Sequence, residues 1–362
     1  MKVYILIGTR PNFIKVTQFK KVAKKSFPEI EIKIIHTGQH YDKNMAEIFF
    51  SQFGLQPDYF LNVGQGTPIQ QIANIQIHLS ELIESIGKPD LLIVPGDVNS
   101  TLAGAITANK MEIPLAHLEA GLRSFDREMP EEHNRLLTDE LSDFLFVTEP
   151  SGLENLKKES KSGEAIYVGN TMIDTLVAFE SEIDQSSVLE DLGIEIGRYI
   201  VVTVHRPSNV DTKEKLIQLI DVFHEVSKDH QIVFPVHPRT KNNIEKFGLT
   251  EEFDSLELIN PGPLGYFEFQ KLTKNCAFVL TDSGGIQEET TFRKVPCITI
   301  RENTERPVTT DIGTNTLASL DKSILLDLIK KIKSGDYKKG EIPEKWDGKA
   351  TFRILESLNS RL

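Results

Sequence analysis

The chain has 362 residues and a formal net charge of −12, with 39% hydrophobic and 26% charged residues. This length allows about two domains, each able to bury a core without metals or disulfides. An acidic chain without a basic block argues against general nucleic-acid binding, and no apolar run reaches the ~18 residues of a membrane span. Two isolated cysteines and the lack of a secretion signal favour the cytoplasm.

The first half of the chain alternates short apolar runs with longer amphipathic stretches. Runs rich in Val, Ile and Leu predict strands, and the periodic stretches between them predict helices. Continuous apolar strands that alternate with helices are typical of parallel sheets buried on both faces. Strands are expected at 3–7, 32–35, 91–94, 114–118, 144–147 and 166–168, and helices at 13–25, 69–86 and 131–141.

The same pattern restarts after a polar, acidic stretch at 181–197. Further strands are expected at 199–204, 232–236, 256–259, 278–281 and 297–300, and an amphipathic helix at 350–362. We predict an α/β protein with two doubly wound domains that face a central cleft. The domains are expected at residues 1–170 and 171–348, with a tail helix at 349–362 that packs back toward the first. Ligands of such sheets bind at the carboxyl ends of the strands.

A glycine pair follows the predicted strand at 278–281. Ser283, Gly284 and Gly285 lie between this strand and a helical stretch, where backbone N–H groups and the helix N-terminus favour a phosphate. The alternative is a tight turn in which Ser283 only caps the helix. Glu289, one turn into the helix, is placed to reach a ribose hydroxyl.

Cationic side chains also gather at predicted strand ends. Arg10 and Lys15 follow the first strand, and Arg301 and Arg306 follow the strand at 297–300. Arginine suits bidentate contact with phosphate, so these residues could hold a pyrophosphate. Each could instead be a solvated surface charge.

Three carboxylates lie near strand ends and suit acid/base chemistry. Asp97, Glu119 and Glu131 would raise one another's proton affinity if they met in one crevice. Each also has a structural alternative: Asp97 could cap a helix, Glu131 could favour a helix N-terminus, and Glu119 could pair with Arg123.

Two histidines, His205 and His237, each follow a strand of the second domain directly. A single histidine at such a position is usually structural, but two in one domain point to one site. No GxGxxG, Walker A or HExxH motif and no zinc-ligand spacing is present, so we expect no dinucleotide cofactor and no metal. The pattern favours chemistry on a nucleotide-linked small molecule.

Along nearly its whole length the chain resembles the non-hydrolysing UDP-N-acetylglucosamine 2-epimerases, which have a glycosyltransferase-B-like fold of two Rossmann-like domains. The resemblance rests on the order and spacing of the following motifs: Gly8-Thr9-Arg10-Pro11 with Lys15, Gly38-Gln39-His40, Gly96-Asp97, His117-Leu118-Glu119-Ala120-Gly121-Leu122-Arg123, Pro130-Glu131-Glu132-His133-Asn134-Arg135, Val204-His205-Arg206, Asp282-Ser283-Gly284-Gly285 and Thr304-Glu305-Arg306-Pro307.

The resemblance implies a reaction in two steps. UDP is eliminated across C1–C2 to give 2-acetamidoglucal and then adds back with the proton delivered to the other face of C2. No cofactor is implied, the partner is a UDP-sugar, and the family suggests a homodimer that serves surface polysaccharide synthesis. The implied acid/base residues are Asp97, Glu119, Glu131 and His205; Arg10, Lys15, Ser283, Gly284, Gly285 and Arg306 would hold phosphates, Glu289 the ribose, and Phe269 would pack near the uracil, with His237 as a further substrate contact.

Departures from the family pattern keep other functions open. The family often has Arg and Glu where this chain has Pro207 and Ser208, and Glu where it has Val308. The changed loops also resemble relatives that act on UDP-2,3-diacetamido-glucuronic acid. A hydrolysing 2-epimerase, a glycosyltransferase and a non-catalytic nucleotide-sugar sensor are the remaining alternatives; core packing is the alternative role for Phe269.

Overall fold

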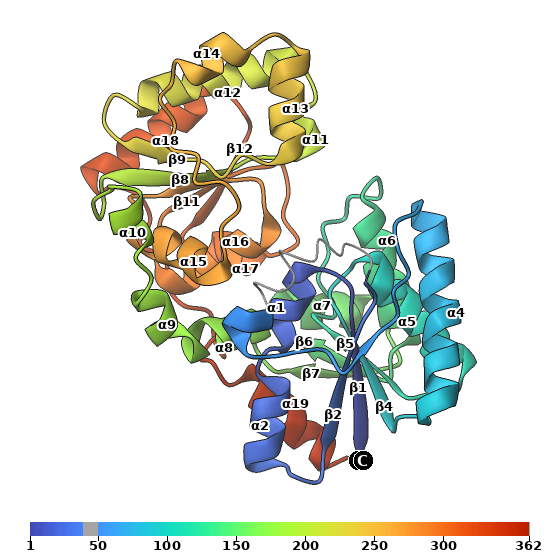
Figure 1. Cartoon of the computed structure of the whole chain (residues 1–362). Helices are drawn as coiled ribbons and strands as arrows, with labels where there is room; N and C mark the ends of the chain where they lie inside the picture. The colour runs from blue at the N-terminus through green and yellow to red at the C-terminus, as the bar shows by residue number, and fades with distance from the viewer. Residues whose placement is uncertain (39–49, 362) are drawn as a thin grey trace. The chain divides into compact units, whose positions relative to one another are not determined.

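A computed structural model describes residues 1–38 and 50–361, so the motif residues Gln39 and His40 lie outside the described part. The chain divides into two compact units (Figure 1). The first unit comprises Met1–Ala178 together with Glu344–Leu362, and the second comprises Phe179–Pro343. Each unit has its own parallel sheet, and each is described by itself.

The first unit contains a seven-stranded sheet in which neighbouring strands are parallel. The inner strand β1 has five of its six residues buried, as expected for a sheet covered on both faces. The strands in spatial order are β3 (Tyr59–Phe60), β2 (Glu31–His36), β1 (Lys2–Ile7), β4 (Leu91–Pro95), β5 (Leu115–Leu118), β6 (Phe144–Val147) and β7 (Glu164–Tyr167).

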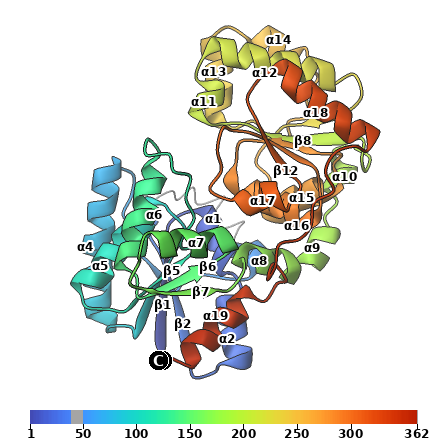
Figure 2. The same ribbon diagram turned by 180° about the vertical axis from the view of Figure 1, so that it is seen from behind.

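Helices cover this sheet and complete its core. Ile75 and Leu79 of the helix after β3 pack with Leu6 and Val94 of the strands in one buried cluster. The last helix, α19, lies beside α2 and α8 (Figure 2). The helices of this unit are α1 (Arg10–Val16), α2 (Phe19–Ser26), α4 (Pro68–Ile86), α5 (Asn99–Lys110), α6 (Pro130–Leu141), α7 (Pro150–Lys158), α8 (Thr171–Ala178) and α19 (Ala350–Asn359).

The second unit contains a five-stranded parallel sheet in the order β12, β11, β10, β8, β9. Its strands are β8 (Tyr199–Thr203), β9 (Gln231–Val233), β10 (Val279–Thr281), β11 (Cys297–Ile300) and β12 (Asn315–Ala318). Its helices are α9 (Glu180–Asp184), α10 (Val188–Asp191), α11 (Pro207–Val210), α12 (Lys213–Val226), α13 (Pro238–Lys246), α14 (Thr250–Asp254), α15 (Tyr266–Asn275), α16 (Gly284–Arg293), α17 (Pro307–Asp311) and α18 (Lys322–Ser334).

The predicted class of two parallel α/β domains is confirmed, but several elements differ from the expectation. The strand expected at 256–259 is wrong: Glu257 has a φ of 50°, and only one parallel bridge, from Val233 to Ile259, forms there. The helix expected at 13–25 is divided into α1 and α2, and the buried Thr17 hydroxyl between them lies 2.6 Å from that of Thr175.

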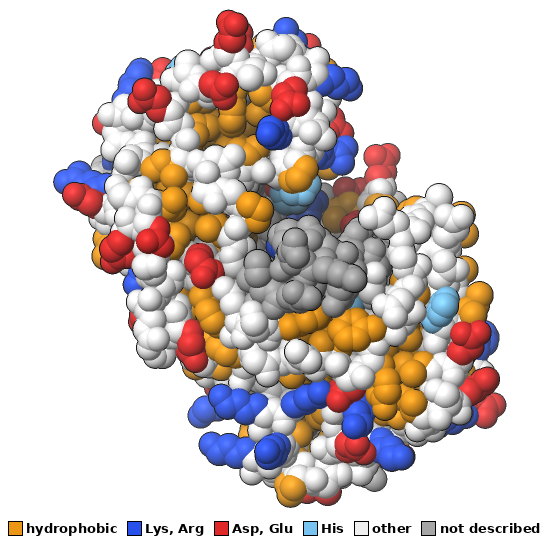
Figure 3. Space-filling view, in the orientation of Figure 1, with side chains coloured by type: hydrophobic (Ala, Val, Ile, Leu, Met, Phe, Trp, Pro, Cys, Tyr) orange, Lys and Arg blue, Asp and Glu red, His pale blue; other side chains and the backbone are white. Residues whose placement is uncertain are grey.

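The surface carries charge where the amphipathic helices face solvent. Lys and Arg side chains gather over the region of α2 (Figure 3), where Lys21, Lys24 and Lys25 are exposed. Within residues 1–38 and 50–361, no group of three or more His, Cys, Asp and Glu side chains is arranged to hold a metal ion. In that same part of the chain, no helix combines the length and apolar character that a membrane crossing needs.

Candidate active site

Asp97 follows β4 and is fixed by helix α6. Its carboxylate Oδ2 lies 2.5 Å from Nη2 of Arg135, and its backbone oxygen accepts a 2.8 Å hydrogen bond from Asn134. Asp97 does not cap the following helix, whose N-cap is Val98 without a side-chain bond. The structural alternative for Asp97 is therefore wrong, and its carboxylate is oriented by a guanidinium instead.

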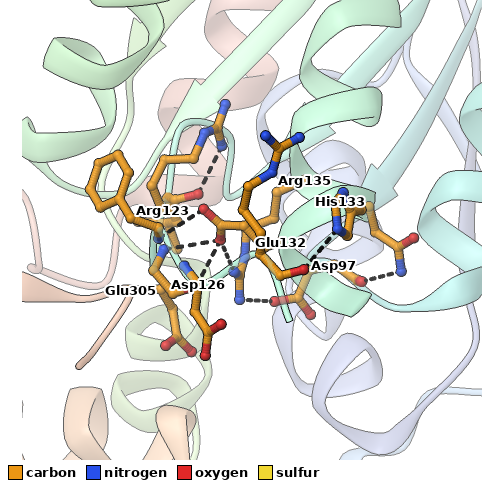
Figure 4. Close-up of polar contacts among 12 residues, drawn as sticks. Asp97, Arg123, Asp126, Glu132, His133, Arg135 and Glu305 are labelled. Carbon is orange, nitrogen blue, oxygen red and sulfur yellow. Dashed lines mark hydrogen bonds and ion pairs between the residues drawn. The ribbon is translucent and has the colours of Figure 1, made fainter. Parts of the chain in front are cut away.

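Arg135 is itself held by a second carboxylate, Glu132, on the same helix (Figure 4). Nη1 of Arg135 lies 2.6 Å from Oε2 of Glu132, and both side chains are buried. Glu132 also accepts hydrogen bonds from the backbone N–H groups of Ser124 and Phe125, each at 3.0 Å. The loop after β5 and the Asp97 carboxylate thus share one support on α6.

Glu119 follows β5 and takes a left-handed backbone conformation, with a φ of 76°. Such a conformation is strained for a residue that carries a Cβ, and strained residues cluster at functional sites. Its Oε2 lies 2.7 Å from Nζ of Lys15, and both side chains are buried. Lys15 also lies over Gly96, where an added Cβ would come within 3.0 Å of Nζ. The structure therefore brings Lys15, Glu119 and the Asp97 loop together.

The alternative pairing of Glu119 with Arg123 is wrong. Arg123 pairs with Asp139 at 2.6 Å and with Glu159 at 2.8 Å. Glu131 lies half-buried in the first turn of α6, and Arg10 is the exposed first residue of α1. These five candidates, Arg10, Lys15, Asp97, Glu119 and Glu131, all belong to the first unit.

In the second unit, His205 is oriented by Asp282. Oδ1 of Asp282 lies 3.1 Å from the His205 Nδ1, and Oδ2 accepts hydrogen bonds from the backbone N–H groups of His205 and Arg206 at 2.9 and 2.7 Å. Burial opposes ionisation of Asp282, but its contacts with His205 outweigh burial and lower its pKa. With Nδ1 engaged by a carboxylate, Nε2 is the ring atom available for proton transfer.

His237 lies beside His205, with the two ring centroids 5.0 Å apart. Its Nδ1 accepts a 3.1 Å hydrogen bond from the backbone N–H of Arg239, so His237 caps helix α13. Burial, and after it the neighbouring His205, lowers the pKa of His237. His237 thus has a structural role as well as a place next to a candidate catalytic group.

Ser283, Gly284 and Gly285 form the start of helix α16 directly after β10. A Cβ at Gly284 would lie 2.8 Å from both Nη1 of Arg306 and Oε1 of Glu305, so any larger residue here would make these two side chains shift. Ser283 makes no side-chain capping bond to the helix, so it is not a simple cap. A helix N-terminus beside a buried guanidinium is suited to an anion such as phosphate.

Glu289, also on α16, is buried against α15. Burial raises the pKa of Glu289 to about 7, against hydrogen bonds with Gln270 and Tyr266 that lower it. Phe269 is half-buried and packs against the core cluster that includes Ile286 and Leu272. His205, His237, Phe269, Ser283, Gly284, Gly285, Glu289 and Arg306 all belong to the second unit.

Arg135, Glu132 and Asp282 hold the candidates in place, and these supporting roles were not predicted from the sequence. Arg135 could have been found from helical spacing, because residues 132, 135 and 139 share one face of a helix over 131–141. Asp282 could have been found from strand order, because β10 pairs with β8 with Thr281 opposite Thr203.

Comparison with known proteins shows which protein family the chain matches. A family model described as UDP-N-acetylglucosamine 2-epimerase matches residues 22–359. The UDP-N-acetylglucosamine 2-epimerase of Methanocaldococcus jannaschii is 41% identical over 343 residues, 91% of each chain. The UDP-2,3-diacetamido-2,3-dideoxy-D-glucuronate 2-epimerase of Pseudomonas aeruginosa is 38% identical over 334 residues, 90% of this chain and 91% of that one. A crystal structure of the M. jannaschii UDP-GlcNAc 2-epimerase with UDP-GlcNAc and UDP matches with a TM-score of 0.89 at 40% identity, covering 99% of this chain and 100% of that one.

Proposed function

The chain belongs to the UDP-N-acetylglucosamine 2-epimerase family, and we propose that it interconverts UDP-N-acetylglucosamine and UDP-N-acetylmannosamine. It is an isomerase, as its motifs predicted. The observation that best supports this substrate is the 40% identity, over the whole chain, to an enzyme crystallised with UDP-GlcNAc and UDP.

The proposed reaction breaks two bonds and then reforms them. A base removes the C2 proton, the C1–O bond breaks with its electron pair going to UDP, and 2-acetamidoglucal forms by anti elimination. UDP then attacks C1 again while an acid delivers a proton to the opposite face of C2. Asp97, Glu119, Glu131 and His205 are the proposed acid/base residues, and the positions of the first two beside Arg135 and Lys15 support this assignment.

The departing pyrophosphate needs positive charge fixed in advance. Arg306 is proposed to supply a guanidinium, which in this structure pairs with Glu288 and Glu305, and the glycine start of α16 is proposed to supply a helix N-terminus. Arg10 and Lys15 are proposed as further phosphate contacts, although Lys15 in this structure pairs with Glu119. Glu289 is proposed to bind the ribose, with Phe269 near the uracil and His237 as a further substrate contact.

Proton NMR of the purified protein with UDP-N-acetylglucosamine in D₂O tests the proposal. We expect a growing UDP-N-acetylmannosamine anomeric signal and deuterium at C2, because the proton is exchanged in the elimination. Free N-acetylmannosamine with UDP would indicate the hydrolysing reaction instead. Binding without any turnover would indicate a nucleotide-sugar sensor.

A second substrate deserves the same assay. The 38% identity to a UDP-2,3-diacetamido-2,3-dideoxy-D-glucuronate 2-epimerase supports a diacetamido uronic acid as the alternative sugar. The two substrates share the UDP group and the acetamido group at C2, so the proposed residues would serve either. Faster C2 exchange in the uronic acid at equal concentration would assign the chain to that substrate.

We also propose that the protein acts in the cytoplasm as a homodimer and supplies surface polysaccharide synthesis. Both cysteines, Cys276 and Cys297, are free and buried, which fits a reducing compartment. The homodimer rests on the family resemblance alone. Light scattering coupled to gel filtration decides it: a mass of one chain, 40.8 kDa, would contradict the homodimer.

A further inference from the structure

His117 is a fully buried histidine in β5 that the proposed reaction does not use. Its Nδ1 lies 2.6 Å from Oδ1 of Asp139, and its Nε2 lies 2.7 Å from the backbone oxygen of Gly96. Gly96 directly precedes Asp97, and His117 itself lies two residues before Glu119. One imidazole ring therefore joins the ends of β4 and β5 to helix α6.

Both ring nitrogens of His117 face groups that only accept hydrogen bonds. A backbone carbonyl has no proton to donate, so Nε2 must carry a hydrogen. Asp139 also accepts hydrogen bonds from Nη2 of Arg123 at 2.6 Å and from the backbone N–H of Gly121 at 3.1 Å, as an ionised carboxylate does.

We propose that His117 is a doubly protonated imidazolium that acts as a positioning residue for the loops carrying Asp97 and Glu119. The positioning role rests on the proposed epimerase reaction, whereas the protonation state rests on the hydrogen bonds alone. His117 and Arg123 face two carboxylates, the buried Asp139 and the partly exposed Glu159, and Lys161 also lies 3.7 Å from Glu159. Such pairing offsets the cost of removing the imidazolium from water.

The two contacts of His117 act on turns whose backbone conformation favours glycine. Gly96 and Gly121 both have a positive φ, of 70° and 79°. The imidazolium holds the Gly96 carbonyl directly and holds the Gly121 N–H through Asp139. Because these turns flank Asp97 and Glu119, a shift of either would displace a candidate acid/base group. Displacements of about 1 Å can cost ~10²-fold in rate.

The protonation state can be measured without any assay of activity. We expect NMR of the whole protein labelled with ¹⁵N-histidine to show, at neutral pH, one histidine with two slowly exchanging ring N–H protons. These signals should disappear in His117→Gln and also in His117→Asn, which serves if the first variant does not fold. A single ring N–H for His117 would overturn the imidazolium.

The positioning role is tested by separating kcat from KM. In His117→Gln the amide nitrogen replaces Nε2 and can still donate to Gly96, whereas in His117→Asn it replaces Nδ1 and can only reach Asp139. We expect kcat to fall ~10- to 100-fold in the Asn variant and less in the Gln variant, with KM changed less than about threefold. His78→Gln, at an exposed position on α4, should behave as the wild type.

The NMR measurement tests the imidazolium of His117, and the kinetic measurement tests its positioning role, so each can be refuted without the other. A kcat within about twofold of wild type in both folded variants would overturn the positioning role while leaving the NMR result intact. Absence of turnover in the wild type would refute the proposed function and the positioning role together. A single ring N–H with normal epimerisation would refute only the imidazolium.

Discussion

Two candidate carboxylates, Asp97 and Glu119, each have one oxygen bound by a cation from a different element. Arg135 reaches Asp97 from α6, and Lys15 reaches Glu119 from α1. Charge-assisted hydrogen bonds of this kind fix the direction of the second carboxylate oxygen. At the residue scale, the fold therefore fixes the orientation of the Asp97 and Glu119 carboxylates as well as bringing them to the ends of strands.

Replacing Glu119 by Gln should remove the negative charge of the side chain while keeping its shape and its hydrogen bond to Lys15. The amide oxygen of Glu119→Gln can still accept a hydrogen bond from Lys15, so we expect UDP binding and folding to persist. Turnover should fall ~10²-fold or more, since the acid/base group is lost. Glu131→Gln should behave alike, and Glu84→Gln on the exposed side of α4 provides the control. Isothermal titration with UDP and the NMR assay measure the two properties; near-normal turnover would remove Glu119 from the mechanism.

Glu289 should make stability depend on pH. Its pKa is raised from 4.5 to about 7 by burial, so between these values the folded protein binds a proton that the unfolded chain has lost. Stability from this group is present in full below pH 4.5 and is lost as the pH rises through 7. A shift of this size corresponds to about 3 kcal/mol.

The variant Glu289→Gln keeps the shape of the protonated acid and does not titrate. We expect it to be more stable than the wild type by up to about 3 kcal/mol at about pH 8.5, with a much smaller difference at about pH 5. Urea unfolding at the two pH values measures this. The same variant should bind UDP more weakly if Glu289 holds the ribose. A stability gain that is independent of pH would contradict the titration argument.

At the scale of elements, helix α16 depends on the absence of a side chain at its start. In Gly284→Ala the new Cβ would press on Arg306 and Glu305 at 2.8 Å, and the guanidinium would have to move. We expect UDP affinity to fall about 10-fold or more with the fold retained, because the proposed phosphate contact of Arg306 depends on the position of its guanidinium. Gly248→Ala meets no atom within 4 Å but has a φ of 66°, so it should lose stability and keep UDP affinity. Calorimetric titration with UDP measures the affinity of each variant. Equal affinities of Gly284→Ala and Gly248→Ala would contradict a phosphate site at α16.

The elements that the sequence predicted are those whose residues are apolar and consecutive, such as β1, β4 and β11. The strand β12 was missed because it begins with Asn315 and Thr316. Asn315 is buried in the second unit, and its polar groups bond Thr299 at 2.6 Å and Gln287 at 3.1 Å. The hydrogen bonds that allow Asn315 to be buried come from residues distant in the sequence, so hydrophobic patterning could not reveal this strand.

In the candidate site, too, some features could be predicted from the sequence and others depend on tertiary contacts. The chemical groups could be predicted, because Asp97, Glu119, His205 and the glycine pair all follow strands. Their partners could not, because Lys15 and Glu119 are 104 residues apart and His205 and Asp282 are 77 apart. These pairs depend on the order of the strands, which places β4 between β1 and β5 in the first unit and β8 beside β10 in the second. Knowing the strand order would have made both pairs predictable.

At the scale of the whole chain, the first unit is built from two distant stretches, with the second unit inserted between them. The returning stretch is held by buried contacts within the first unit. Trp346 is buried and donates a 3.0 Å hydrogen bond from Nε1 to the Thr148 carbonyl. Asp174 of α8 accepts hydrogen bonds from the backbone N–H groups of Ala350 and Thr351 at 3.0 and 2.6 Å, at the start of α19. The stability of the first unit therefore depends on a helix that follows the second unit in the chain.

Removing the Asp174 carboxylate should release that helix. In Asp174→Ala two buried N–H groups lose their partner, which costs about 2–3 kcal/mol in the free energy of unfolding. Asp321→Ala removes an exposed cap of α18 in the second unit and should cost only about 1 kcal/mol. Hydrogen exchange resolved by peptide should quicken in α19 and in its neighbours α2 and α8 for the first variant, and only in α18 for the second. Unchanged exchange in α19 would mean that Trp346 and the apolar face of α19 hold the returning stretch without Asp174.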